Sequence, residues 1–200
     1  MGRVGDAALV LLLLAAGLGL LLLGLQAVGG PYGSRDLYAS CRAQYAESGI
    51  AQSATAGKWV RHVSIDPFDD TRTILLSLEA DSGESTWGDP VRLNVRLKQG
   101  ELEVFINWHE YLGGGFDNSG HLVAFRLGFD DPLVSTWNYS TDHDTTFYRR
   151  YGGPNVCGFI LQLAQADRFV AETTPYMEDP ITAVFDVRGL AHYLPELLGN

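Results

Sequence analysis

The chain has 200 residues and a formal net charge of −10 at pH 7, and 46% of its residues are apolar. This length allows one domain with a substantial core. The acidic balance argues against nucleic acid as a partner and against a polybasic contact with anionic lipid, because both of these surfaces attract basic residues.

The first element is an apolar segment, residues 7–28, which contains no charged residue. An apolar helix of about 20 residues spans the hydrocarbon core of a bilayer, whereas the apolar region of a cleaved signal peptide is shorter, about 7–15 residues. We therefore predict that residues 1–30 are an uncleaved signal anchor that contacts the lipid bilayer through residues 7–28. A cleaved signal peptide is the alternative, because Ala27, Val28 and Gly29 resemble a small-residue cleavage site.

The location of the remaining residues depends on the orientation of this segment. Arg3 precedes it, but Arg35 and Arg42 lie beyond it, so the positive-inside bias is weak. The amino-terminal tail is short, which favours export of the carboxy-terminal residues. We therefore predict a single-pass inner-membrane protein whose carboxy-terminal domain lies in the periplasm.

Residues 31–57 are predicted to form a juxtamembrane helix and a linker. Ser34 is a candidate cap for a helix over residues 35–47, and Gly49 is placed to end it. Four residues form one stripe of this helix, suited to packing on a domain: Leu37, Tyr38, Cys41 and Tyr45.

Residues 58–200 are predicted to fold as one β domain. Strands are expected at 59–65, 71–80, 91–98, 101–108, 121–127, 133–139, 171–174 and 181–187. Residues 66–70 are predicted to be a turn and residues 81–90 a polar loop. A short helix within 159–169 and a terminal helix over 189–198 are expected beside the strands.

The clearest pattern in the chain is the hairpin at residues 91–108. Apolar and polar side chains alternate on both sides of Gln99 and Gly100, and a two-residue loop with glycine second is typical of a tight hairpin. That turn predicts five cross-strand pairs: Lys98 with Glu101, Arg96 with Glu103, Leu97 with Leu102, Val95 with Val104, and Leu93 with Ile106. The aliphatic face of a hairpin needs a second layer to cover it. We therefore predict a mainly β fold, an antiparallel β-sandwich with short flanking helices, preceded by one amino-terminal transmembrane helix.

A series of short motifs occurs in one order between residues 57 and 198. They are Trp59, Ser64, Asp69-Asp70, Thr73-Ile74-Leu75-Leu76, Leu93-Asn94-Val95-Arg96, Glu103-Val104-Phe105-Ile106, Val123-Ala124-Phe125-Arg126, Trp137, Ser140-Thr141-Asp142, Phe147, Phe159-Ile160, Pro175-Tyr176, Ala183-Val184-Phe185-Asp186 and Gly189-Leu190. In this order they resemble the VasI/TagO family of envelope proteins associated with bacterial type VI secretion. The chain departs from the family pattern at Leu97, where the pattern has a cysteine. The resemblance implies a non-catalytic accessory or assembly protein that acts through contacts with envelope or secretion-system proteins.

Cys41 and Cys157 are the two cysteines of the chain. An exported domain permits a disulfide between them, which would close a loop of more than one hundred residues. Two separate buried thiols are the alternative, because a free cysteine behaves as a small apolar residue.

The connection after the central hairpin is the candidate binding loop. Glycines and aromatic residues meet there, and binding loops tend to lie on rigid sheets. Its residues are Trp108, His109, Glu110, Tyr111, Gly113, Gly114 and Gly115. The alternatives are a flexible connection without function and a small-ligand or glycan site lined by Trp87, Trp108, Tyr111 and His109.

Asp142, His143 and Asp144 offer ligands for a metal or groups for a hydrolase, but their spacing matches no zinc or calcium motif. A polar turn explains the same residue types. We therefore expect no catalytic residues, no metal and no cofactor, and we keep a hydrolase only as a lesser alternative.

Overall fold

The computed structural model describes residues 34–114, 120–149 and 155–199, and side chains from residue 37 onward. The chain divides into two compact units, Met1–Tyr32 and Gly33–Asn200, and the described residues belong to the second. The segment 7–28, predicted to be an anchor, lies outside the described residues, as does its alternative cleavage site. Within the described ranges, no helix is long and apolar enough to cross a membrane.

The described part of the chain contains three helices and nine strands, and the helices occur before, between and after the strands. They are α2 (Ser34–Ser48), β1 (Val60–Ile65), β2 (Arg72–Glu84), β3 (Pro90–Lys98), β4 (Glu101–Asn107), β5 (His121–Leu127), β6 (Leu133–Tyr139), β7 (Thr145–Phe147), α3 (Val156–Gln165), β8 (Arg168–Thr173), β9 (Ile181–Asp186) and α4 (Leu190–Leu198). The strands and helices predicted after residue 34 are therefore present, although β8 begins at Arg168, within the stretch predicted to hold a short helix. The three-residue strand β7 is an addition to them.

The predicted β-sandwich is wrong, because the strands close into an eight-stranded antiparallel barrel. The hydrogen-bonded order is β1-β2-β3-β4-β7-β6-β5-β8-β9, and β9 pairs in turn with β2. Strand β1 pairs with the first half of β2 and stays outside the closed circle. A sandwich and a barrel share the same alternation of apolar and polar residues, so the alternation alone does not separate them.

The closure depends on the far end of β2, which the sequence predicts to be part of a polar loop. Strand β2 continues to Glu84 after a register shift, and Ser82 lies opposite Val184 of β9. Gly83 has a φ of +107°, and a Cβ there would lie 2.6 Å from the carbonyl oxygen of Thr182. Main-chain pairing therefore continues the strand where the apolar pattern has already ended.

The central hairpin has the predicted register. Lys98 lies opposite Glu101, Arg96 opposite Glu103, Leu97 opposite Leu102, Val95 opposite Val104, and Leu93 opposite Ile106. Gln99 and Gly100 both have positive φ, as a tight hairpin turn of the primed type requires. Four aliphatic residues of the pairs, Leu93, Val95, Val104 and Ile106, are buried in the core. The side chains of Arg96 and Glu103 form an ion pair on the other face.

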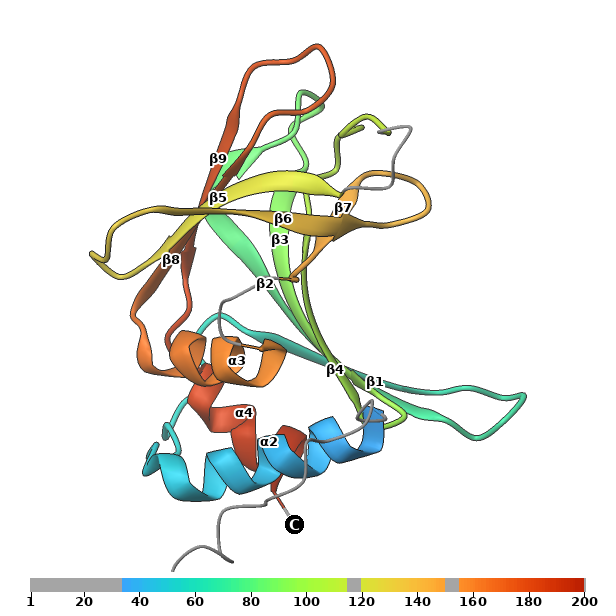
Figure 1. Ribbon diagram of the computed structural model, residues 1–200, viewed down its shortest axis with the longest axis vertical. Helices are drawn as coiled ribbons and strands as arrows, with labels where there is room; N and C mark the ends of the chain where they lie inside the picture. Colours follow the sequence, from blue (N-terminus) through green and yellow to red (C-terminus); the bar gives the residue numbers. More distant parts are fainter. Residues whose placement is uncertain (1–33, 115–119, 150–154, 200) are drawn as a thin grey trace, which may run out of the picture. The chain divides into compact units, whose positions relative to one another are not determined.

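The helices lie together at one end of the barrel, and several long loops lie at the other end (Figure 1). Phe159 of α3 is buried and its ring contacts those of Phe125, Trp137 and Phe169 from three strands. Helix α4 buries Leu190, Leu194, Leu197 and Leu198 in the same core. The apolar faces of these helices therefore close the barrel at this end.

Helix α2 is joined to this helical end by a disulfide. Cys41 bonds Cys157 of α3, across a sequence separation of 116 residues. The hydroxyl of Tyr38 donates a hydrogen bond of 2.7 Å to the carbonyl oxygen of Leu197. Helix α2 and the residues up to 57 lie within the range 31–57 that is predicted to be a juxtamembrane helix and linker, and they belong to the same compact unit as the barrel.

Candidate functional site

Four connections gather at the end of the barrel opposite the helices (Figure 1). They are residues 85–89 between β2 and β3, residues 108–114 after β4, residues 140–144 between β6 and β7, and residues 174–180 between β8 and β9. We call these four segments the loop end. The candidate binding loop predicted from the sequence is the second of them.

The segment 108–114 is bonded through its main chain to two of the other connections. The Trp108 amide donates to the carbonyl oxygen of Asp144 at 2.9 Å, and the Leu112 amide donates to that of His143 at 2.8 Å. The Tyr176 amide donates to the carbonyl oxygen of Tyr111 at 3.0 Å. These bonds connect the segment with 140–144 and with 174–180, so it does not behave as an independent flexible connection.

Glu110 provides the link to the remaining connection. Its carboxylate accepts hydrogen bonds from both the amide and the hydroxyl of Thr86. The side chain is only 9% exposed, and a buried carboxylate is costly unless it is hydrogen-bonded. The pair therefore holds residues 85–89 against the base of the segment 108–114.

Large side chains project from these connected loops into solvent. Tyr111 is 54% exposed, Tyr176 57%, Trp87 84% and Met177 85%. The rings of Tyr111 and Tyr176 meet edge to face with their centroids 6.0 Å apart. Grouped exposed aromatics indicate a contact surface, whereas single exposed apolar residues are ordinary on any protein.

Two histidines and a tyrosine lie beneath this surface. The hydroxyl of Tyr139 is 3.3 Å from Nδ1 of His121, and the Tyr139 ring packs on that of His143 at 4.9 Å. Within the described ranges, Nε2 of His121 and Nδ1 of His143 are buried without a hydrogen-bond partner. Burial lowers the pKa of His121 and outweighs the opposite effect of the Thr174 backbone. The neutral form of His121 is therefore favoured in the folded protein.

The predicted residues of the binding loop have different environments. Trp108 is fully buried, so the expectation that it lines a binding surface is wrong: it continues the inward-facing row of β4, and its indole N–H donates to Thr146. His109 is half-buried and has a φ of 55°, while its amide donates to the side chain of Asn107. Tyr111 is the aromatic residue of this loop that reaches solvent.

The glycines of this loop allow close packing. Gly113 has a φ of +77°, and a Cβ there would lie 3.2 Å from the ring of Tyr176. A Cβ on Gly114 would lie 3.2 Å from the ring of His143. Gly115 lies outside the described residues. The two described glycines therefore let the loop contact its aromatic neighbours closely.

The segment 142–144 has the features of a polar turn. The carboxylate of Asp144 accepts hydrogen bonds from Ser140 and Thr145. A hydrogen bond from Ser140 lowers the pKa of the exposed Asp142. Across residues 34–114, 120–149 and 155–199, no group of three or more His, Cys, Asp and Glu side chains is placed to hold a metal ion.

Tyr176 and Met177 are surface residues that the sequence does not single out. They follow Pro175 between two strands, where the residue types indicate an ordinary turn. These residues come near Tyr111 because β5, β8 and β9 are neighbours in the barrel. The order of strands in a barrel cannot be deduced from the sequence pattern of one segment.

These features define a class of protein: a disulfide-bonded antiparallel barrel, closed by helices at one end and presenting hydrogen-bonded loops at the other. A scan of protein-family models and searches of curated proteins and of solved structures find no match to the chain.

Proposed function

We propose that the protein is a membrane-anchored, non-catalytic accessory protein of the bacterial envelope that binds another envelope protein through its loop end. The observation that carries this proposal is the group of exposed residues Trp87, Tyr111, Tyr176 and Met177 on loops that are hydrogen-bonded to one another. Protein interfaces are enriched in aromatic residues and methionine. A surface that is already ordered loses less conformational entropy when a partner binds.

The disulfide supports a location outside the cytoplasm. Cys41 and Cys157 are bonded, and disulfides persist in oxidising compartments such as the periplasm and are rare in the cytosol. This agrees with the role we propose for residues 1–30, a signal anchor in the inner membrane. The domain would then be held near the membrane surface, where other envelope proteins are accessible.

A contact with a protein is better supported at the loop end than a small-ligand site. Small ligands prefer concave sites that bury most of their surface. Five grooves on the described part of the barrel are lined by residues other than Trp87, His109 and Tyr111. The exposed aromatics are therefore placed to contact a surface larger than one small molecule. The resemblance to the VasI/TagO family further suggests a component of a secretion apparatus as the partner.

The proposal is tested by crosslinking in cells. The full chain carrying a tag is crosslinked and purified, and enriched proteins are compared between the wild type and Tyr176→Ala. The matched control is Phe68→Ala, which removes a still more exposed aromatic in the β1–β2 turn, where Phe68 is 98% exposed. We expect one envelope protein to be enriched with the wild type and the control and lost with Tyr176→Ala. Enrichment that is equal for all three chains, or none for any of them, would refute the proposed role of the loop end.

A further inference from the structure

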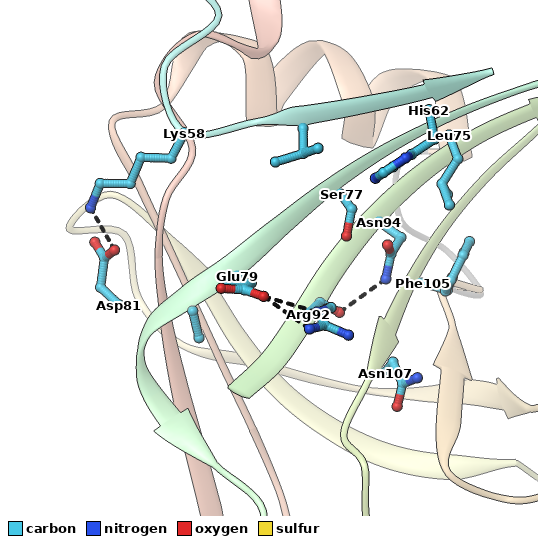
Figure 2. Close-up of a pocket in the computed structure, with 12 residues that line it drawn as sticks. Lys58, His62, Leu75, Ser77, Glu79, Asp81, Arg92, Asn94, Phe105 and Asn107 are labelled. Carbon is cyan, nitrogen blue, oxygen red and sulfur yellow. Dashed lines mark hydrogen bonds and ion pairs between the residues drawn. The ribbon is translucent and has the colours of Figure 1, made fainter. Parts of the chain in front are cut away.

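The outer face of β1 to β4 carries a second feature, a polar groove separate from the loop end (Figure 2). The groove has a volume of about 730 Å³, within the range of small-molecule sites. Its lining comes from alternate residues of four neighbouring strands and from Lys58 ahead of β1. It exists because β1 stays outside the closed circle of strands and extends the sheet beyond the barrel.

The register places the lining residues in rows that cross the strands. One row contains Val60, Ser77, Asn94 and Phe105, which are paired in turn along β1, β2, β3 and β4. The adjacent row contains Glu79, Arg92 and Asn107. Three spacings between strands of about 4.8 Å make the first row about 14 Å long. A linear ligand of about three rings fits this length.

The groove presents donors and acceptors that the described residues leave available. The Asn94 side chain is 5% exposed, and its amide nitrogen donates to the carbonyl oxygen of Arg92. Asn107 uses its side-chain oxygen to accept from the amide of His109. Within the described part of the chain, the oxygen of Asn94, the nitrogen of Asn107 and the hydroxyl of Ser77 have no hydrogen-bond partner. These three residues line the groove, so their polar atoms are available to a ligand with many hydroxyl and amide groups.

The charges of the groove are already paired. Lys58 bonds Asp81 at 2.6 Å, and Arg92 bonds Glu79 at 2.9 Å, as Figure 2 shows. The two cations and two anions cancel, so the groove offers no excess charge to an anionic or cationic ligand. Phe105 adds an aromatic surface at one side.

From these observations we infer that the groove binds a neutral oligosaccharide of about three sugar rings. Sugar hydroxyls can donate hydrogen bonds to Ser77, Asn94 and Asn107 and accept hydrogen bonds from them, and the C–H groups of a sugar ring can pack beside Phe105. Acetamido groups match the side-chain amides of Asn94 and Asn107 and have a methyl group that fits beside Val60 and Leu75. This inference is independent of the contact proposed for the loop end, because the two surfaces share no residue.

The test uses the full chain in lipid nanodiscs with chitotriose, a neutral trisaccharide with acetamido groups, as the probe. Saturation-transfer NMR measures magnetisation passed from the protein to the sugar, with empty nanodiscs as the blank. Two variants address the groove: Ser77→Trp fills its floor, and Arg92→Met removes a guanidinium while keeping an aliphatic stem. Ser64→Trp is the matched control, because Ser64 is exposed on β1 and does not line the groove.

We expect saturation transfer with the wild type and with Ser64→Trp, and an affinity at least about tenfold lower, or about 1.4 kcal/mol, with Ser77→Trp and with Arg92→Met. If Ser77→Trp fails to fold by near-ultraviolet circular dichroism, Arg92→Met decides the question. The inference is overturned if chitotriose shows no transfer up to millimolar concentration, or if both groove variants bind as the wild type does. It is also overturned if trialanine binds the groove and chitotriose does not.

Discussion

Ser82 of β2 lies opposite Val184 of β9, and this pair closes the strands from β2 to β9 into a barrel, with β1 outside the circle. The closure pairs the edge that β9 would otherwise leave open, and β1 keeps one free edge outside the circle. The same closure brings the β2–β3 and β8–β9 connections to one end of the barrel, where they form part of the loop end.

The first prediction concerns Gly83, next to this pair. Gly83→Ala should lower the free energy of unfolding, because a Cβ would lie 2.6 Å from the Thr182 carbonyl oxygen and 2.7 Å from the Ala183 Cα. Gly88 also has positive φ, but no atom lies within 4 Å of its Cβ position, so Gly88→Ala reports the backbone cost alone. We expect Gly83→Ala to cost about 1–3 kcal/mol more than Gly88→Ala in urea unfolding. Equal costs would contradict close packing at the junction.

A second prediction concerns the disulfide between α2 and α3. The bond spans 116 residues, and the chain-entropy estimate for a loop of this length is about 4–5 kcal/mol as an upper value. Cys41→Ser combined with Cys157→Ser should lower the unfolding free energy by up to this amount, and dithiothreitol should lower it in the wild type but not in the double variant. Reaction of both cysteines with a thiol reagent, in unfolded protein purified without reductant, would contradict the bond.

A third prediction concerns pH and His121. Burial lowers its folded pKa below the ordinary value of 6.5, so the unfolded chain binds this proton first as the pH falls. The stability contributed by neutral His121 should therefore be present above about pH 6.5 and be lost as the pH falls toward the lowered folded pKa. His121→Phe should remove this slope in unfolding free energies measured from about pH 7.5 to pH 5.

Asp186 and Glu196 affect stability at a lower pH than His121 does. Ion pairs with Arg188 and with Arg61 lower the pKa values of Asp186 and Glu196, so their stabilisation is lost as the pH falls from the ordinary carboxylate pKa, about 4, through the lowered folded pKa. A slope of the same size in the wild type and in His121→Phe would show that His121 is not its source.

A fourth prediction concerns the order of the loop end. Glu110→Ala removes the acceptor of the Thr86 amide and hydroxyl, so hydrogen exchange of the amides in residues 85–89 should become faster. Glu101→Ala, at an exposed carboxylate at the start of β4, is the matched control and should leave this exchange unchanged. Unchanged exchange in Glu110→Ala would mean that residues 85–89 are held by other contacts.

The local elements were predictable because their side-chain patterns are strong. The alternation on both sides of Gln99 and Gly100 defines the hairpin and its register, since charge pairs and aliphatic pairs require the same alignment. The barrel was not predictable in this way. The barrel closes at Ser82 and Gly83, which pair through their main chain and not through an apolar side-chain pattern. It also requires the strand β7, whose three residues are too few to form a recognisable pattern.

The candidate site was predictable only where it depends on local sequence patterns. The glycines after β4 indicate the candidate binding loop, and Tyr111 is exposed within it. Trp108 belongs to the inward row of β4, so the alternation itself already excludes it from the surface. Tyr176 joins Tyr111 only through strand order, which depends on contacts between distant parts of the chain.

Photocrosslinking from single positions of the full chain in cells is the most direct test of the proposed contact surface. A photoreactive phenylalanine analogue replaces Tyr111 at the loop end or, as the matched control, Phe129 in the β5–β6 turn, where the side chain is 95% exposed. We predict a covalent adduct with an envelope protein from position 111 and none from position 129. Adducts from position 129 alone, or the same adducts from both positions, would contradict the loop end as the contact surface.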